Sequence, residues 1–452
     1  MARLRTRTTH DETNTMGTIH RTLLLPALAG AFLFAACSDD DDDKPTPTIT
    51  AALPVLGLDT LATAVAAAGL DLDLAGTGPF TLYAPTDAAF AALPDGVLDS
   101  LLLPQNQQAL IDVLLYHVVP DAVSIADAAA MESDTTLSGP DILIDTLDAE
   151  LYINNARVLD GDNVASNGII HTIDQVLLPP ADIFATLTDR GFETLTMAIT
   201  AADLETTLTT PGDYTLLAPT DAAFVALGQV PIDQAELQAL LNYHLINQRA
   251  TASDALTVEL VETSQGQNVL FSFEAGQLRV NGIPITHFNI PCTNGIIHVV
   301  DTVIEAPVTI AQTAVAAGLS TLVTALAAAD LTATFDNAAE GPFTVFAPTN
   351  AAFDALPAGV LNQLLDPINQ AVLIDVLQYH VVLTEYTAAG VVAASGTGLT
   401  TLEGNSLTIA TGGGDVTVDG NTLGSLNVLA SNGIIHTIGG VLLPPGAIAA
   451  LQ

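Results

Sequence analysis

The chain has 452 residues, of which 49% are apolar, and it carries 50 acidic residues against 9 basic ones, for a formal net charge of −41. This length is enough for about three domains with apolar cores. Because binding to nucleic acid or to anionic headgroups needs clustered cations, the charge excludes both as direct partners. The two cysteines, Cys37 and Cys292, show no Cys-x-x-Cys spacing, so no structural zinc site is predicted.

The N-terminal segment has the features of a signal peptide. Residues 22–36 form an apolar run behind Arg21. The run is too short to span a bilayer as a helix and has the size of a signal-peptide core. It ends in "FAAC", which resembles a bacterial lipobox, although Phe34 stands where an aliphatic residue is usual.

We therefore interpret residues 1–36 as a signal peptide, Cys37 as a lipidated residue and residues 37–47 as an acidic tether that cannot form a core. This pattern is typical of a bacterial lipoprotein delivered to the outer membrane, in contact with the membrane through its lipid anchor only. An ordinary secretory signal in which Cys37 is incidental stays open as the alternative. So does a start at Met16.

Three sequence boxes recur in the same order, with a period of about 130 residues. A period of this length indicates tandem globular domains rather than a solenoid. A segment ending in proline follows the third box each time, which places the domains at 48–180, 181–306 and 307–446. In the first unit the boxes are "LYAPTDAAF" at 82–90, "LLYHVV" at 114–119 and "SNGIIHTI" at 166–173. Their counterparts lie at 216–224, 241–246 and 293–300 in the second unit, and at 345–353, 377–382 and 431–438 in the third.

The first unit shows which elements each domain contains. Residues 58–70 have the apolar spacing of an amphipathic helix with a glycine stop. Residues 79–85 predict a strand, and Thr86 after it fits a helix N-cap. Residues 105–117 predict a helix that runs into a strand, and short alternating strands follow over 135–178. Helices before strands in each unit predict an α+β fold.

The three ordered boxes resemble the fasciclin domain family over essentially all of residues 48–446, and "FAPTNAAF" at 346–353 matches best. The resemblance implies three tandem domains, each a β-sheet wedge packed with helices, and a role in adhesion by secreted or membrane-anchored proteins. Its signature residues are Pro85, Thr86, Phe90, Asn167, Gly168 and His171 in the first unit, Pro219, Thr220, Phe224, Asn294, Gly295 and His298 in the second, and Pro348, Thr349, Phe353, Asn432, Gly433 and His436 in the third.

The Tyr-His pair of the second box is tied to receptor contact in animal members of this family. The resemblance therefore makes these pairs candidate partner-contact residues. Adjacent residues on a strand point to opposite faces, so one side chain of each pair can be buried and the other exposed. A purely structural role is the competing interpretation. The candidates are Tyr116, His117, Tyr243, His244, Tyr379 and His380.

The histidine of the third box admits a functional and a structural interpretation. Two histidines per unit could bind a metal, or one could act as a general base. Strand alternation, however, places His171 on the same face as Ile169 and Ile173. This pattern favours a half-buried neutral imidazole that bonds a neighbouring loop through one ring nitrogen. Cys292 takes the place of a small residue and is expected to be buried.

No catalytic motif is present: the sequence lacks a G-x-S-x-G elbow, an H-E-x-x-H pair and a P-loop. No cofactor or metal is predicted, and loose calcium binding stays open at the acidic stretches 38–44 and 139–150. We expect a non-enzymatic, envelope-anchored protein whose partners are extracellular protein, matrix or polysaccharide. A scaffold that binds a small molecule or a metal is the alternative.

Overall fold

The computed structural model describes residues 45–94, 96–228, 233–412 and 415–451. The predicted signal peptide and Cys37 lie outside the described residues, as does most of the predicted tether. The described part contains three domains with closely similar element order, and each is a mixture of helices and sheet, which confirms the α+β class.

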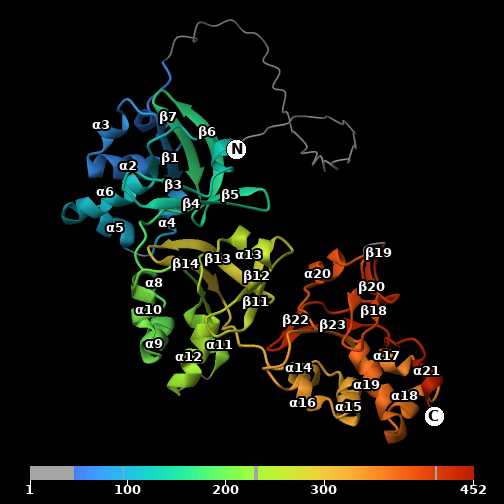
Figure 1. Cartoon of the computed structure of the whole chain (residues 1–452). Helices are drawn as coiled ribbons and strands as arrows, with labels where there is room; N and C mark the ends of the chain where they lie inside the picture. Colours follow the sequence, from blue (N-terminus) through green and yellow to red (C-terminus); the bar gives the residue numbers. More distant parts are fainter. Residues whose placement is uncertain (1–44, 95, 229–232, 413–414, 452) are drawn as a thin grey trace, which may run out of the picture. The chain divides into compact units, whose positions relative to one another are not determined.

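Domain 1 begins with helices, inserts one strand between them and ends in a series of strands (Figure 1). Its elements are α1 (Ile49–Ala52), α2 (Asp59–Ala68), α3 (Asp71–Leu74), β1 (Phe80–Pro85), α4 (Asp87–Ala91), α5 (Val97–Leu101), η1 (Pro104–Asn106), α6 (Gln107–Tyr116), β2 (Val118–Val119), α7 (Ile125–Ala128), β3 (Ser133–Thr135), β4 (Asp141–Leu147), β5 (Glu150–Ile153), β6 (Ala156–Ala165) and β7 (Gly168–Ile173).

Domain 2 follows the same order, without counterparts of α5 and η1 among its described residues. Its elements are α8 (Ile183–Asp189), α9 (Glu193–Ala201), α10 (Glu205–Thr209), β8 (Tyr214–Pro219), α11 (Asp221–Leu227), α12 (Gln234–Tyr243), β9 (Leu245–Ile246), α13 (Ala252–Val258), β10 (Leu260–Glu262), β11 (Asn268–Glu274), β12 (Gln277–Val280), β13 (Ile283–Cys292) and β14 (Gly295–Val300).

Domain 3 repeats the order again, with shorter and more interrupted strands. Its elements are α14 (Ile310–Ala316), α15 (Ser320–Ala328), α16 (Thr332–Phe335), β15 (Phe343–Pro348), α17 (Asn350–Asp354), α18 (Val360–Leu364), η2 (Pro367–Asn369), α19 (Gln370–Tyr379), β16 (Val381–Val382), α20 (Ala388–Ala393), β17 (Leu399–Thr400), β18 (Ser406–Leu407), β19 (Ile409–Gly412), β20 (Asp415–Val418), β21 (Asn421–Thr422), β22 (Val428–Ala430), β23 (Gly433–Ile438) and α21 (Ala447–Ala450).

The sheet of domain 1 has the strand order β2-β1-β7-β6-β5-β4-β3. Strands β1 and β7 pair in parallel and bring the first and third boxes side by side, with Tyr83 opposite His171. Domain 2 has the corresponding order β10-β11-β12-β13-β14-β8-β9, and β8 and β14 are its parallel pair. In domain 3 the sheet divides into β16-β15-β23-β22 and the smaller sheets β17-β18 and β19-β20-β21.

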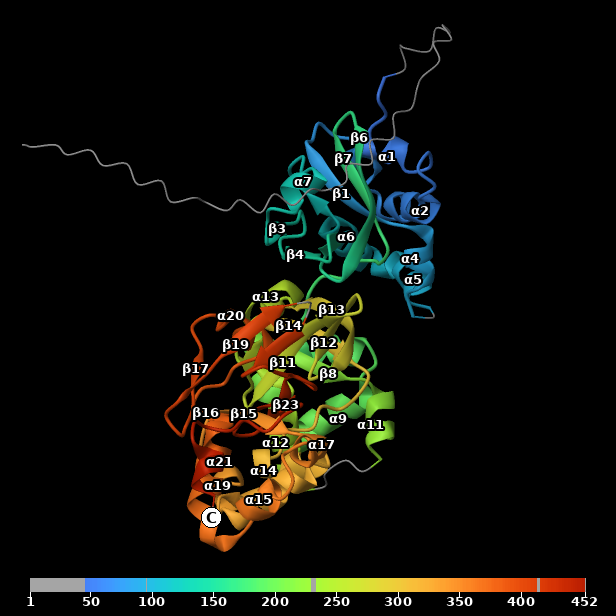
Figure 2. The same cartoon turned by 90° about the vertical axis from the view of Figure 1, so that its right-hand side faces the viewer.

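Both faces of the central strands are buried. Leu82 and Ile170 face a core formed with the helices of domain 1, whereas Tyr83 and Ile173 face a second core between the strands and α7. This division follows from the alternation of side chains along a strand. The helices α2 and α5 accordingly gather on one side of β1 and β7 (Figures 1 and 2).

Most of the local predictions are confirmed. The first amphipathic segment is α2, and Gly69 ends it in the left-handed conformation at φ 77°. Phe90 is buried in the core, and Ala165 pairs with Gly168 at the turn between β6 and β7.

The prediction that the Tyr-His pair lies on a strand is wrong. Helix α6 ends at Tyr116, His117 is its C-cap, and the strand begins only at Val118. Both side chains point into the protein from the helix end, so the division into one buried and one exposed residue does not occur.

Candidate functional site

The histidine of the third box uses both of its ring nitrogens in hydrogen bonds. In domain 1, Nδ1 of His171 accepts a hydrogen bond from the backbone N–H of Asp162 at 3.1 Å. Its Nε2 lies 2.8 Å from the carbonyl oxygen of Val123 and donates to it. The ring is therefore the neutral Nε2–H tautomer. The sequence predicted one such bond, whereas the structure shows two, which join β7 to a bend in β6 and to the segment before α7.

The same two bonds recur in the other domains. His298 accepts from the N–H of Asn289 and donates to the carbonyl of Ala250. His436 accepts from the N–H of Asn427 and donates to the carbonyl of Tyr386. Burial lowers the pKa of His298 to about 4 and also lowers the pKa of His171 and His436.

The histidine of the second box also uses both ring nitrogens, but with the donor and the acceptor nitrogen exchanged. Nδ1 of His117 donates to the carbonyl of Val113 at 2.7 Å, and Nε2 accepts from the N–H of Leu177 at 2.9 Å. This ring is the Nδ1–H tautomer, and it connects the end of α6 to the segment after β7. The corresponding bonds join His244 to Leu240 and Ile304, and His380 to Val376 and Leu442.

The three second-box histidines are buried and uncharged. Burial lowers the pKa of His117, His244 and His380 to about 4. A protonated ring would have to donate from both nitrogens, but one nitrogen of each ring faces a backbone N–H and has no acceptor to bind. These histidines therefore contribute to the framework of each domain as neutral rings.

The three tyrosines of the second box are buried as well. The hydroxyl of Tyr116 donates to the carbonyl of Asp141 at 3.0 Å and accepts from Nδ2 of Asn154. Burial raises the pKa of Tyr116 to about 12. Tyr243 repeats these bonds with Asn268 and Asn281, and Tyr379 donates to the carboxylate of Asp419 at 2.7 Å.

The burial of these Tyr-His pairs favours a structural role over the partner-contact role that the resemblance implies. The most exposed of the six side chains, Tyr379, shows only 5% of its surface to solvent. The described structure therefore offers none of the six as a contact surface. Their partner-contact role stays a prediction that only a binding measurement tests, and the geometry supports the competing structural role.

The first box caps two helices at once. The Thr86 hydroxyl accepts from the N–H of Ala89 and caps α4, as the sequence predicted. Oδ1 of Asp87 accepts from the N–H of Thr60 at 2.8 Å and so caps the neighbouring helix α2. The equivalent second caps join Asp221 to Thr194 and Asn350 to Thr321.

The asparagine of the third box connects three segments. Oδ1 of Asn167 accepts from the N–H of Ile49, and its Nδ2 donates to the carbonyls of Leu74 and Gly76. The side chain thus holds α1 and the end of α3 against the β6–β7 turn. Asn294 and Asn432 form the same three bonds in their domains.

The glycine after this asparagine is required by the parallel strand pair. A Cβ on Gly168 would collide with the carbonyl oxygen of Phe80 on β1. Gly295 and Gly433 meet the carbonyls of Tyr214 and Phe343 in the same way. Only a residue without a side chain permits this approach of the two backbones.

A buried threonine in the first strand was missed at the sequence level. The Thr81 hydroxyl donates to the carbonyl of Asp121 at 2.6 Å and accepts from the N–H of Val123. Thr215 and Thr344 repeat both bonds. The recurrence of this threonine is visible in the sequence. It occupies the second position of "FTLYAP", "YTLLAP" and "FTVFAP", one residue before the first box of each unit.

The free thiol of the described residues is also enclosed. Cys292 is a buried free thiol, and burial raises its pKa to about 11, so it is not a nucleophile at neutral pH. Within the ranges that the structure describes, no group of three or more His, Cys, Asp or Glu side chains is placed to hold a metal ion. None of the described helices is both long enough and apolar enough to cross a membrane.

Comparison with known proteins places this repeated framework in a family. The model of the fasciclin domain matches residues 56–179, 190–306 and 317–444. The chain belongs to the fasciclin family. Its three fasciclin domains coincide with the three units that share the histidine, asparagine and threonine bonds.

The relatives include animal and bacterial fasciclin proteins. The pig transforming growth factor-beta-induced protein ig-h3 is 31% identical over 377 residues, which cover 82% of this chain and 54% of that protein. Protein sll1483 of Synechocystis is 47% identical over 107 residues, 24% of this chain and 59% of that protein. The chain thus spans about half the length of the ig-h3 proteins that it matches.

Among solved structures, a domain pair from the insect cell adhesion molecule fasciclin I aligns with 18% identity and a TM-score of 0.28. The alignment covers 55% of this chain and 97% of that one.

Proposed function

We propose that this protein is a non-catalytic adhesion protein of the bacterial cell envelope, in which three tandem fasciclin domains attach to cells, matrix or polysaccharide. One observation carries the proposal. The histidine, asparagine and threonine side chains that recur in all three domains direct their hydrogen bonds to the backbone of their own domain, so what recurs is a framework rather than a reactive site.

The surface that this framework supports differs from one domain to the next. Met197 is 65% exposed on α9, where the equivalent position of the other domains is Thr63 or Thr324. Ile368 is exposed in η2, where domain 1 has Gln105. Three similar domains with different exposed side chains are suited to several weak contacts that add through effective concentration.

The negative charge of the chain favours neutral or cationic partners over anionic ones. A protein with 50 acidic and 9 basic residues attracts neutral or cationic surfaces and repels anionic ones unless cations intervene. Attachment to neutral polysaccharide or to a basic protein is therefore favoured over attachment to an anionic polymer. We expect its strength to depend on salt according to the sign of the partner's charge.

Lipidation at Cys37, outside the described residues, would supply the anchor and keep the domains at the cell surface. A Cys37→Ala variant tests this step: we expect it to leave the membrane fraction and to lose labelling by a radioactive fatty acid. A variant that stays in the membrane and remains labelled would overturn the anchor but not the adhesive role.

The adhesive role is tested by binding of the chain, without its first 44 residues, to immobilised glycans, matrix proteins and whole cells. Deletion of any one domain is expected to weaken attachment by degrees, because multivalent contacts are lost one at a time. Complete loss with one domain and no loss with the other two would contradict the multivalent model. The matched surface variants Met197→Thr and Ile368→Gln should reduce attachment and leave the melting temperature unchanged.

A further inference from the structure

The helical core of domain 3 has a smaller side chain than the cores of the other two domains at one fully buried position. In each domain an isoleucine N–H binds the third-box asparagine, and the residue four positions later points into the core. That residue is Leu53 in domain 1 and Leu187 in domain 2, with 1% and 0% of its surface exposed. In domain 3 it is Ala314, also 0% exposed.

A second exchange in domain 3 restores the number of carbon atoms but not their arrangement. Phe335 stands where the other domains have Leu74 and Leu208, a position fixed by the carbonyl that accepts from the asparagine amide. The loss of three carbons at Ala314 is thus matched by the gain of three at Phe335. A flat ring at one site does not fill the space of a branched chain at the other, because cores pack by shape as well as by volume.

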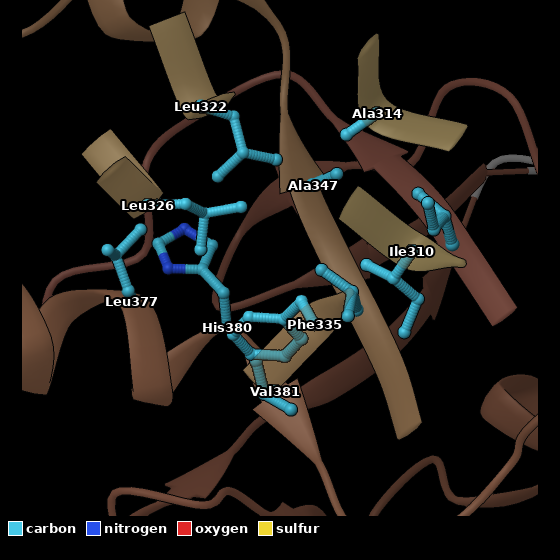
Figure 3. A pocket seen from close by; sticks show the side chains of 11 residues that line it. Ile310, Ala314, Leu322, Leu326, Phe335, Ala347, Leu377, His380 and Val381 are labelled. Carbon is cyan, nitrogen blue, oxygen red and sulfur yellow. The ribbon is translucent and has the colours of Figure 1, made fainter. Parts of the chain in front are cut away.

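A cavity results between these residues. It measures about 20 Å³ as the volume open to the centre of a water-sized sphere. Figure 3 shows Ala314, Leu322, Leu326, Phe335 and the ring of His380 around it. Every lining residue is buried, so the cavity is enclosed by the domain rather than open to solvent.

A water molecule has the right size for this cavity but would find no partners there. A buried water typically makes about three hydrogen bonds. His380 is the only polar side chain of the lining, and its nitrogens are already bonded to the carbonyl of Val376 and the N–H of Leu442. The other lining side chains are aliphatic or aromatic, and enclosed apolar cavities of this kind favour apolar atoms.

We propose that the core of domain 3 is a binding site for one small apolar molecule of the size of a noble gas atom or a light hydrocarbon. The enclosure excludes long chains and polar ligands, and the leucines at the equivalent position deny the site to domains 1 and 2. This property is independent of adhesion.

The test uses the full chain with methyl labelling and xenon as the probe. Nuclear magnetic resonance under increasing xenon pressure is expected to give saturable shifts in the methyl groups that line the cavity, among them Leu322, Val345 and Ile435. Ala314→Leu is expected to abolish these shifts, and Ala314→Val to reduce them. Shifts that are absent, that do not saturate, or that persist in Ala314→Leu would overturn the proposal, as would a water bound in the cavity.

The reciprocal variant covers the case in which Ala314→Leu fails to fold. Leu187→Ala combined with Leu208→Phe copies the domain 3 arrangement into domain 2. A folded variant of this kind is expected to gain a second set of saturable xenon shifts, in domain 2, with the first set unchanged. The domain 2 set failing to appear would contradict the assignment of the site to these two exchanges.

Discussion

Domains 2 and 3 share the histidine, asparagine and threonine bonds of the polar framework and differ in how their apolar cores are filled. His298 and His436 form equivalent bonds, as do Asn294 and Asn432, whereas Leu187 is replaced by Ala314 and a cavity appears. Hydrogen bonds are directional, and the loss of one partner leaves the other buried and unsatisfied. Apolar contacts have no such direction, so volume can be exchanged between neighbouring positions. The comparison shows which part of a fasciclin domain tolerates change.

The largest expected effect is acid destabilisation of the framework in all three domains. The pKa of His117, His244, His298 and His380 is about 4 in the folded protein against 6.5 in the unfolded chain. The folded state therefore binds fewer protons, so stability is complete above pH 6.5 and falls as the pH drops from 6.5 to 4. Each ring contributes up to about 3 kcal/mol.

Urea unfolding at pH 7.0, 6.0 and 5.0 measures this effect before most carboxylates titrate. A free energy of unfolding that stayed constant between pH 6.5 and 5 would contradict the neutral tautomers assigned to these rings.

The next largest effect is expected from the third-box asparagine. Asn432→Ala removes the partner of the N–H of Ile310 and of the carbonyl of Phe335, and one of the two bonds to the carbonyl of Asn337, at a cost of about 4 kcal/mol. Asn294→Ala should cost as much in domain 2, because its three bonds are the same. Thermal unfolding followed domain by domain is the measurement, and the exposed Asn405→Ala is the control with no expected change. Unequal costs in the two domains would break the equivalence of their frameworks.

Removal of a core leucine from domain 2 tests how its core differs from that of domain 3. Leu187→Ala is expected to destabilise domain 2 by about 3 kcal/mol, since it removes buried carbons and leaves a cavity. Leu187→Ala combined with Leu208→Phe should recover part of this loss, as domain 3 does with Phe335. Chemical denaturation compares the two variants, and an equal loss in both would show that the aromatic ring does not compensate.

The smallest effect is expected at the helix caps of the first box. Thr349→Ala removes the hydroxyl that accepts from the N–H of Ala352, which is worth about 1 kcal/mol. Thr220→Ala should cost the same in domain 2. The change in melting temperature of each variant is the measurement, and a Thr349→Ser variant should retain most of the stability. A serine that behaved like alanine would show that the hydroxyl is not the cause.

The amino-acid sequence is sufficient to predict the number of domains, the α+β class, the first helix, the first strand and the Thr86 cap. These features depend on local periodicity and on side chains that act within a few residues, both of which are readable from one chain. The repeats added the family, because three ordered boxes recur at one period. A threonine at the position of Thr81 also recurs in every unit, one residue before the first box, but it was not part of the predicted site.

The partners of the repeated polar groups follow from the three-dimensional fold and not from the sequence pattern. His171 binds Val123, 48 residues away, and His117 binds Leu177, 60 residues away. Partners this distant are set by how the chain folds back on itself, and no local pattern encodes them. The burial of both side chains of the Tyr-His pair depends on such distant segments as well, for example through the bond from the N–H of Leu177 to His117. The cavity beside Ala314 depends on the shapes of side chains from several segments, so a count of carbon atoms in the sequence gives no sign of it.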